Sequence, residues 1–169
     1  MDCVLRQWKK EDAKGLANLL NNKKILDNLC DGLPYPYTEQ DAQNYIGDML
    51  KADKNSIFAF CIIFKGKVAG CISGFRQNNI FSQSAEIGYY VDEFYWNKGV
   101  ATSAVKTICK YIFENSDIIR IFATPFARNL PSCKVLEKAG FICEGTLRSG
   151  AVKNGKTEDI RIYAKIKSS

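Results

Sequence analysis

Histidine is absent from this sequence. Without an imidazole, the Ser-His-Asp and Cys-His schemes that activate a nucleophile are excluded. The seven cysteines are scattered and form no C-x-x-C pair, so the common zinc arrangements have no support and no metal site is expected. An odd number of scattered thiols favours a reducing compartment, in which cysteine serves mainly as a small apolar residue.

Long hydrophobic runs are also absent, because nothing approaches the roughly 18 consecutive apolar residues of a membrane span. The opening Met1-Asp2-Cys3-Val4 lacks the basic-then-apolar pattern of a signal peptide. We therefore expect a cytoplasmic protein that makes no membrane contact.

The remaining composition is that of an ordinary globular domain. The chain has 169 residues, of which 46% are hydrophobic and 25% charged, and this predicts a single domain over residues 1–169 with a real core. The net charge of +6 fits a pocket for an anionic ligand, weak contact with nucleic acid, or solubility alone. Basic and aromatic residues are not interleaved in a recognised RNA motif, so nucleic-acid binding is disfavoured.

Hydrophobic periodicity predicts an α+β (mixed α/β) fold built on one central sheet. Helices are expected from residue 11, over 38–50 with Thr38 as N-cap, over about 99–114, and from Asn129 to Gly140. The loop at 31–37 either stiffens a connection or walls a substrate pocket. Strands are expected at 3–8, 56–64, 68–75, 85–91, 118–123, 141–147 and 157–166, with hairpin turns at 65–67 and 154–155.

The segment from Trp96 to Ala101 lies between a strand and an amphipathic helix. A helix start offers unpaired N–H groups and the positive end of the helix dipole, which suits a phosphate or diphosphate. Gly99 would allow a ligand to approach the backbone closely, although a lone glycine before a helix is more often a plain turn. The second glycine and the Gly-Lys-Ser/Thr ending of a P-loop are missing.

Several segments in order resemble the GNAT superfamily of N-acetyltransferases. Residues 90–101 resemble its acetyl-CoA loop, and residues 129–132, 137–141 and 144–145 resemble the helix and strand that follow. The beginning (Leu5-Arg6, Asp12-Ala13) and the end (Asn154-Gly155, Asp159, Tyr163) are similar to the branch of ribosomal-protein N-terminal acetyltransferases. The resemblance implies a single domain with a twisted, mostly antiparallel sheet of about seven strands and about four flanking helices. The resemblance does not decide between a monomer and a homodimer.

The sequence departs from the family pattern at two positions. Trp96 replaces the usual Gln or Arg of the loop, and Leu136 stands where many members carry a tyrosine that protonates the leaving thiolate. By resemblance, backbone groups of Val91 pair with the pantetheine arm, and the loop holds the diphosphate with Thr102. Lys98 adds a charge there or is simply solvated, and Asn129 contacts the cofactor, caps a helix, or does both. The cofactor-binding residues expected from the resemblance are Tyr90, Val91, Trp96, Asn97, Lys98, Gly99, Val100, Ala101, Thr102, Asn129 and Ser132.

Two side chains are candidates for catalysis, Glu86 and Ser132. In a regular strand Glu86, Gly88 and Tyr90 share one face, so the carboxylate lies beside a glycine gap that a substrate could enter. It is a candidate base, directly or through water, against the alternative of a surface glutamate. A family β-bulge in this strand would break that alternation and offer an N–H to the acetyl oxygen.

Ser132 is a candidate proton donor to the thiolate because Leu136 cannot donate; the alternative is a local hydrogen bond in the first helical turn. Cys133, next to it, has no evident base and is expected to be a buried bystander.

These residues predict an enzyme that moves an acetyl group from acetyl-CoA to a primary amine by direct transfer in a ternary complex. The amine would be a protein N-terminus or a small molecule such as a polyamine or an antibiotic. A non-catalytic CoA-binding module of the same fold is the alternative.

Overall fold

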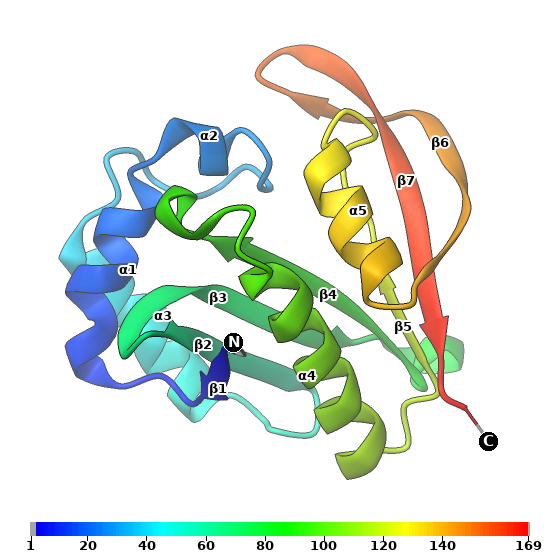
Figure 1. The fold of residues 1–169 in the computed structure, drawn as a ribbon, viewed down its shortest axis with the longest axis horizontal. Helices are drawn as coiled ribbons and strands as arrows, with labels where there is room; N and C mark the ends of the chain where they lie inside the picture. The colour runs from blue at the N-terminus through cyan, green and yellow to red at the C-terminus, as the bar shows by residue number, and fades with distance from the viewer. Residues whose placement is uncertain (1–2, 169) are drawn as a thin grey trace.

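The computed structural model describes residues 3–168 as one seven-stranded sheet with helices on both faces (Figure 1). The strand order is β1-β2-β3-β4-β5-β7-β6, and every pairing is antiparallel except that of β4 with β5. The strands are β1 (Val4–Arg6), β2 (Ile57–Phe64), β3 (Lys67–Arg76), β4 (Ser84–Val91), β5 (Arg120–Ala123), β6 (Ile142–Lys153) and β7 (Lys156–Ile166).

Five α-helices flank this sheet, one of them a single turn. They are α1 (Ala13–Leu20), α2 (Lys23–Leu26), α3 (Glu39–Lys51), α4 (Val100–Asn115) and α5 (Leu130–Lys138). Short 3-10 turns lie at Lys10–Asp12, Asn79–Phe81 and Glu93–Tyr95. In residues 3–168 no helix is both long and apolar enough to cross a bilayer.

Two hydrophobic cores lie on opposite faces of the sheet. α4 crosses one face of β1–β4 and continues toward α5, so the larger core joins both helices to β1–β5 and β7. α1 and α3 cover the other face over β2 and β3, and enclose a second core around Trp8, Leu16 and Ile46. Because β4 contributes to both cores, its two faces are fixed by packing on either side.

A half-buried ion pair joins β1 to the start of α1. Arg6 donates two hydrogen bonds to the Asp12 carboxylate, Nη1 to Oδ2 at 2.7 Å and Nη2 to Oδ1 at 2.8 Å, and the Lys9 N–H donates to Oδ2 at 2.8 Å. Asp12 is 7% exposed. The hydrogen bonds from Arg6 lower the pKa of this carboxyl below its ordinary value.

Helix ends follow the predicted capping chemistry. Thr38 and Asp41 form a reciprocal capping box at the start of α3. Asn129 Oδ1 accepts from the Ser132 N–H at 3.3 Å at the start of α5, and Gly140 follows its end with a φ of 89°.

The predicted strands and main helices are confirmed, with some boundaries corrected. The first strand is shorter than 3–8 and covers only Val4–Arg6, and a 3-10 turn precedes α1. The one-turn helix α2 was not predicted, since its four residues carry no periodic signal. β6 runs on to Lys153 rather than ending at 147, because irregular pairing between Leu147 and Ala151 lets it rejoin β7.

Candidate functional site

The central feature of the candidate site is the separation of β4 from β5. The two strands pair only where Ser84–Glu86 meets Arg120–Phe122, and beyond that point they diverge (Figure 1). On its other side, β4 keeps an unbroken register with β3 from Ala85 to Val91, so the pairing shows no bulge in this strand. The sheet is therefore open along one side of β4.

Backbone groups of β4 point into this opening. The Ser84 carbonyl accepts from Gln77 N and the Asp92 N–H donates to Ala69 O, both at 2.8 Å, so even-numbered residues face β3. Strand alternation then directs the groups of the odd-numbered residues toward the side that β5 has left. The residues concerned are Ile87, Tyr89 and Val91.

The start of α4 presents further backbone donors. Gly99 is its N-cap with a φ of 76°, and Asn97 also has a positive φ, of 58°. Because glycine has no side chain, no side-chain cap satisfies the first N–H groups of the helix, and the first intrahelical bond runs from Ser103 N to Gly99 O at 3.0 Å. The predicted helix start with free donors is present, and Val100, Ala101 and Thr102 form its first turn.

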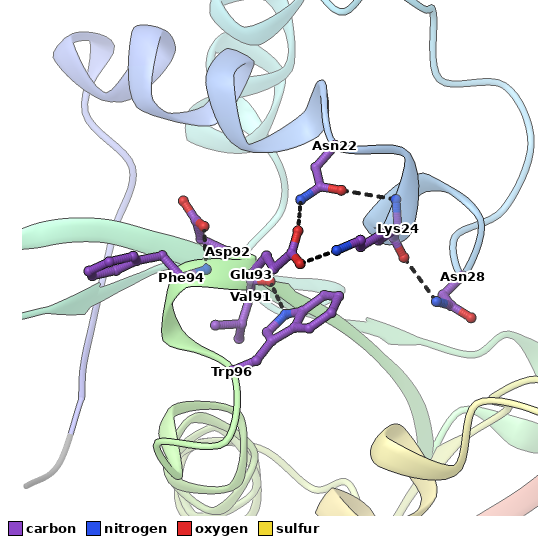
Figure 2. Close-up of polar contacts among 8 residues, drawn as sticks. All are labelled: Asn22, Lys24, Asn28, Val91, Asp92, Glu93, Phe94 and Trp96. Carbon is purple, nitrogen blue, oxygen red and sulfur yellow. Dashed lines mark hydrogen bonds and ion pairs between the residues drawn. The ribbon is translucent and has the colours of Figure 1, made fainter.

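Trp96 holds the turn between β4 and α4. Its Nε1–H donates to the Val91 carbonyl at 2.8 Å, while the ring stays 40% exposed (Figure 2). The Val91 carbonyl is thereby engaged, and strand alternation still directs its N–H toward the opening. The tryptophan that replaces the family's Gln or Arg thus shapes the loop through a backbone contact.

The acidic residues of the same turn have basic or backbone partners. Asp92 Oδ1 accepts from the Phe94 N–H at 2.9 Å, and Glu93 accepts from Asn22 at 2.8 Å and forms an ion pair with Lys24 of α2 (Figure 2). Hydrogen bonding to Lys24 lowers the pKa of Glu93. This charge is therefore neutralised by α2, which lessens its repulsion of an anion at the start of α4.

An open pocket of about 500 Å³ lies along the first two turns of α4. It includes the predicted Gly99 and Thr102, and it adds two lysines that the sequence analysis did not assign to a site, Lys106 and Lys138. Lys106 lies on α4, and Lys138 comes from the far end of α5. The remaining lining residues are Ser103 and Thr107.

Glu86 lies on the other face of β4, where α4 is absent. Its Oε1 accepts from the Thr124 hydroxyl at 2.6 Å, and Phe75 and Phe122 are its register partners on either side. A Cβ placed on Gly88 would meet no heavy atom within 4 Å, so the space beside the carboxylate is open. Thr124 directly follows β5 and contacts Glu86 on the neighbouring strand β4, and no local sequence signal indicates this contact.

Ser132 lies in the first turn of α5 beside Asn129, as its spacing predicted. Its Oγ is 2.9 Å from the Tyr89 hydroxyl, which also donates to the Ser132 carbonyl at 3.2 Å. Leu136 is fully buried and Cys133 is 2% exposed, so both belong to the core. Tyr89 was not among the predicted site residues.

Tyr90 and Lys98 are not directed toward the opening. The Tyr90 ring packs in the core under α1 and α3, and burial raises the pKa of its hydroxyl well above the ordinary value. Lys98 Nζ turns back to the Phe94 carbonyl at 2.7 Å and lies 4.2 Å from the centroid of the Phe94 ring.

The segment after α2 is tied to the C-terminal hairpin. Arg128 links Asn28 and Glu158 with hydrogen bonds of 2.8 Å, and Lys153 forms an ion pair of 2.7 Å with Asp31. These contacts join the segment after α2 to the loop before α5 and to the β6–β7 hairpin. Within residues 3–168, no group of three or more Cys, Asp or Glu side chains is placed to hold a metal ion.

Comparison with known proteins identifies a matching protein family. The sequence model of a family described as an acetyltransferase (GNAT) domain matches residues 2–142. The chain is 31% identical to the L-amino acid N-acetyltransferase AaaT of Escherichia coli (strain K12), over 98% of this chain and 99% of that protein. It is 35% identical to "Probable N-acetyltransferase YjcK" of Bacillus subtilis (strain 168), over 69% of this chain and 65% of that protein.

The fold also matches solved structures. A structure of RimL, a ribosomal L7/L12 α-N-protein acetyltransferase in complex with coenzyme A, superposes with a TM-score of 0.86. The match covers 98% of this chain and 94% of that one at 23% sequence identity, so it establishes the shared fold.

Proposed function

The chain belongs to the GNAT family of acetyltransferases, and on this basis we propose that it transfers the acetyl group of acetyl-CoA directly to a primary amine while both are bound. The observation that carries this proposal is the opening beside β4, which begins next to Glu86 and leads toward the start of α4. A long, thin cofactor with a diphosphate at one end and a thioester at the other fits such an arrangement.

Acetyl-CoA would be held mainly by backbone groups. The N–H groups at the start of α4 suit the diphosphate, because they lack side-chain caps and carry the positive end of the helix dipole. Lys106 and Lys138 in the adjoining pocket suit the remaining phosphate of CoA. The pantetheine arm would lie along β4 in the place that β5 has left. The backbone groups of Tyr89 and Val91 would hydrogen-bond to the arm, and Asn129 would border it from α5.

Glu86 would accept the proton of the attacking amine. A free amine has a pKa of about 8 at a chain N-terminus and about 10.4 on lysine, so both are largely protonated at neutral pH. The Thr124 hydroxyl occupies Oε1 and fixes the carboxylate, which leaves Oε2 for the amine or a bridging water. The nitrogen lone pair then forms the C–N bond, the electrons of the C–S bond leave on sulfur, and the second proton of the ammonium group passes to water.

The acceptor would enter on the Glu86 face of the sheet, opposite α4. Phe75 and Phe122 flank the carboxylate, so the acceptor meets apolar surface on both sides of a single negative charge. This arrangement favours a primary amine carried on a compact, partly apolar group, as at a protein N-terminus or in an amino acid. Among the similar proteins, AaaT is named as an L-amino acid N-acetyltransferase and RimL as an α-N-protein acetyltransferase.

Two measurements test the proposal in sequence. Acetyl-CoA at millimolar concentration should raise the melting temperature, since a ligand that binds the folded state must stabilise it; no shift would refute the cofactor assignment. A thiol-release screen against N-terminal peptides, amino acids, polyamines and aminoglycosides should then find an acceptor. Binding of acetyl-CoA without thiol release for any amine would favour a non-catalytic CoA-binding module instead.

A further inference from the structure

Tyr89 contacts the first turn of α5 through its hydroxyl. The phenol comes from β4, on the face that packs under α4 and α5, and reaches Ser132 at both its Oγ (2.9 Å) and its carbonyl oxygen (3.2 Å). The contact spans the region where β4 has parted from β5. Tyr89 therefore joins the open strand to the helix whose first turn holds the candidate proton donor.

Each of the two hydroxyl groups has one proton, so it matters which hydroxyl donates and which accepts. A phenol, with an ordinary pKa of about 10, is a stronger hydrogen-bond donor than an aliphatic alcohol. When the Tyr89 proton points to Ser132 Oγ, the serine proton must point elsewhere. When it points to the carbonyl, the serine proton is free to point back at Tyr89. The two acceptors on Ser132 therefore allow both arrangements without any movement of heavy atoms.

We infer that Tyr89 is a positioning residue for the leaving thiolate, because it holds Ser132 Oγ with the serine proton directed to the sulfur of CoA. This inference rests on the proposed acetyl transfer. As the C–S bond breaks, its electron pair collects on sulfur, and the Ser132 hydroxyl donates a hydrogen bond to it. Glu86 takes one of the two protons that the ammonium group loses and water takes the other, so CoA departs as a thiolate and no proton is lost from either hydroxyl.

Burial supports a positioning role rather than proton transfer from Tyr89 itself. Desolvation raises the pKa of this phenol above its ordinary value, so it stays protonated while a thiolate is present. A neutral phenol that donates to Oγ polarises the serine hydroxyl and orients it. The tyrosine that many family members place at position 136 is missing here, and Tyr89 instead reaches the first turn of α5, four residues earlier, from the sheet.

Steady-state kinetics with the acceptor found by the screen give the first test. Tyr89→Phe should lower kcat about tenfold, with the Kd of acetyl-CoA within about twofold of wild type, since the ring and its packing remain. Adding Tyr89→Phe to Ser132→Ala should lower kcat by less than about twofold further, because Tyr89 acts through Ser132. Tyr111 lies on α4 and its ring packs on Phe60 of β2, away from Ser132. Tyr111→Phe removes only its hydroxyl and should leave kcat unchanged. Additive losses in the double variant would overturn the proposal.

A second test needs no acceptor. The thiol of bound CoA is titrated by its ultraviolet thiolate absorbance, with wild type compared to Tyr89→Phe and Ser132→Ala. Each substitution should raise the pKa of the bound thiol by about one pH unit, the equivalent of a tenfold loss of thiolate stabilisation. An unchanged thiol pKa in Ser132→Ala overturns the inference even if Tyr89→Phe fails to fold. A wild-type protein that shows the lowered thiol pKa but releases no thiol with any amine keeps this inference and refutes the proposed transfer.

Discussion

Replacing Gly99 with alanine tests the assignment of the diphosphate to the start of α4. Gly99 has a φ of 76°, a left-handed conformation that costs an L-residue about 1–2 kcal/mol. A Cβ there would meet no heavy atom within 4 Å, so no clash adds to this strain. We therefore expect a loss of about 1 kcal/mol, which lowers the melting temperature of a chain of this size by about 2–4 °C.

The same methyl group would project into the space proposed for the diphosphate. Displacing one charge-assisted hydrogen bond, worth about 1.5–3 kcal/mol, should weaken CoA binding about tenfold to hundredfold. Gly155→Ala is a matched control, because Gly155 has a φ of 73°, open space around its Cβ position and a place in the β6–β7 turn. Calorimetric titration with CoA should separate the two variants while their melting temperatures agree. Equal CoA affinities for Gly99→Ala and Gly155→Ala would refute the assignment.

Three further outcomes follow from the described contacts. Glu86→Gln should lower kcat about a hundredfold in the thiol-release assay at neutral pH with little change in the Kd of acetyl-CoA; a wild-type kcat would exclude the carboxylate as base. Lys106→Glu and Lys138→Glu should weaken CoA more than 3′-dephospho-CoA, and equal losses for both ligands would place the 3′-phosphate elsewhere. Asp12→Asn should destabilise the fold by about 1–2 kcal/mol in urea unfolding, because it weakens charged hydrogen bonds and leaves the half-buried Arg6 charge without its partner. The Asp12 pKa is lowered on folding, so the wild-type advantage should be full above about pH 5 and disappear as acid protonates the folded carboxyl; an advantage that grew as the pH fell would contradict this.

The sequence was sufficient for the elements whose signals are local. The N-cap Thr38 predicted the start of α3, and the apolar stripe from Ala101 to Ile112 predicted α4. Alternation in β4 placed Glu86 beside the gap at Gly88 correctly, because packing on both faces keeps this strand regular.

The rest depends on contacts between residues far apart in the chain. The pairing of β4 with β5 ends after three residues, and no residue type in either strand predicts where it ends. Thr124 meets Glu86 across 38 positions, and Tyr89 meets Ser132 across 43. Propensity and spacing describe single elements, so such partners become visible only when the elements are packed together.

The divergence of β4 and β5 also has a mechanical consequence for the protein. Beyond the short ladder between β4 and β5, the portion with β1 to β4 is joined to the C-terminal portion by side-chain contacts such as those of Tyr89 with Ser132 and Thr124 with Glu86, and by the packing of α4 against α5. A ligand bound between β4 and β5 would contact both portions and would add hydrogen bonds between them that the two strands do not make to each other.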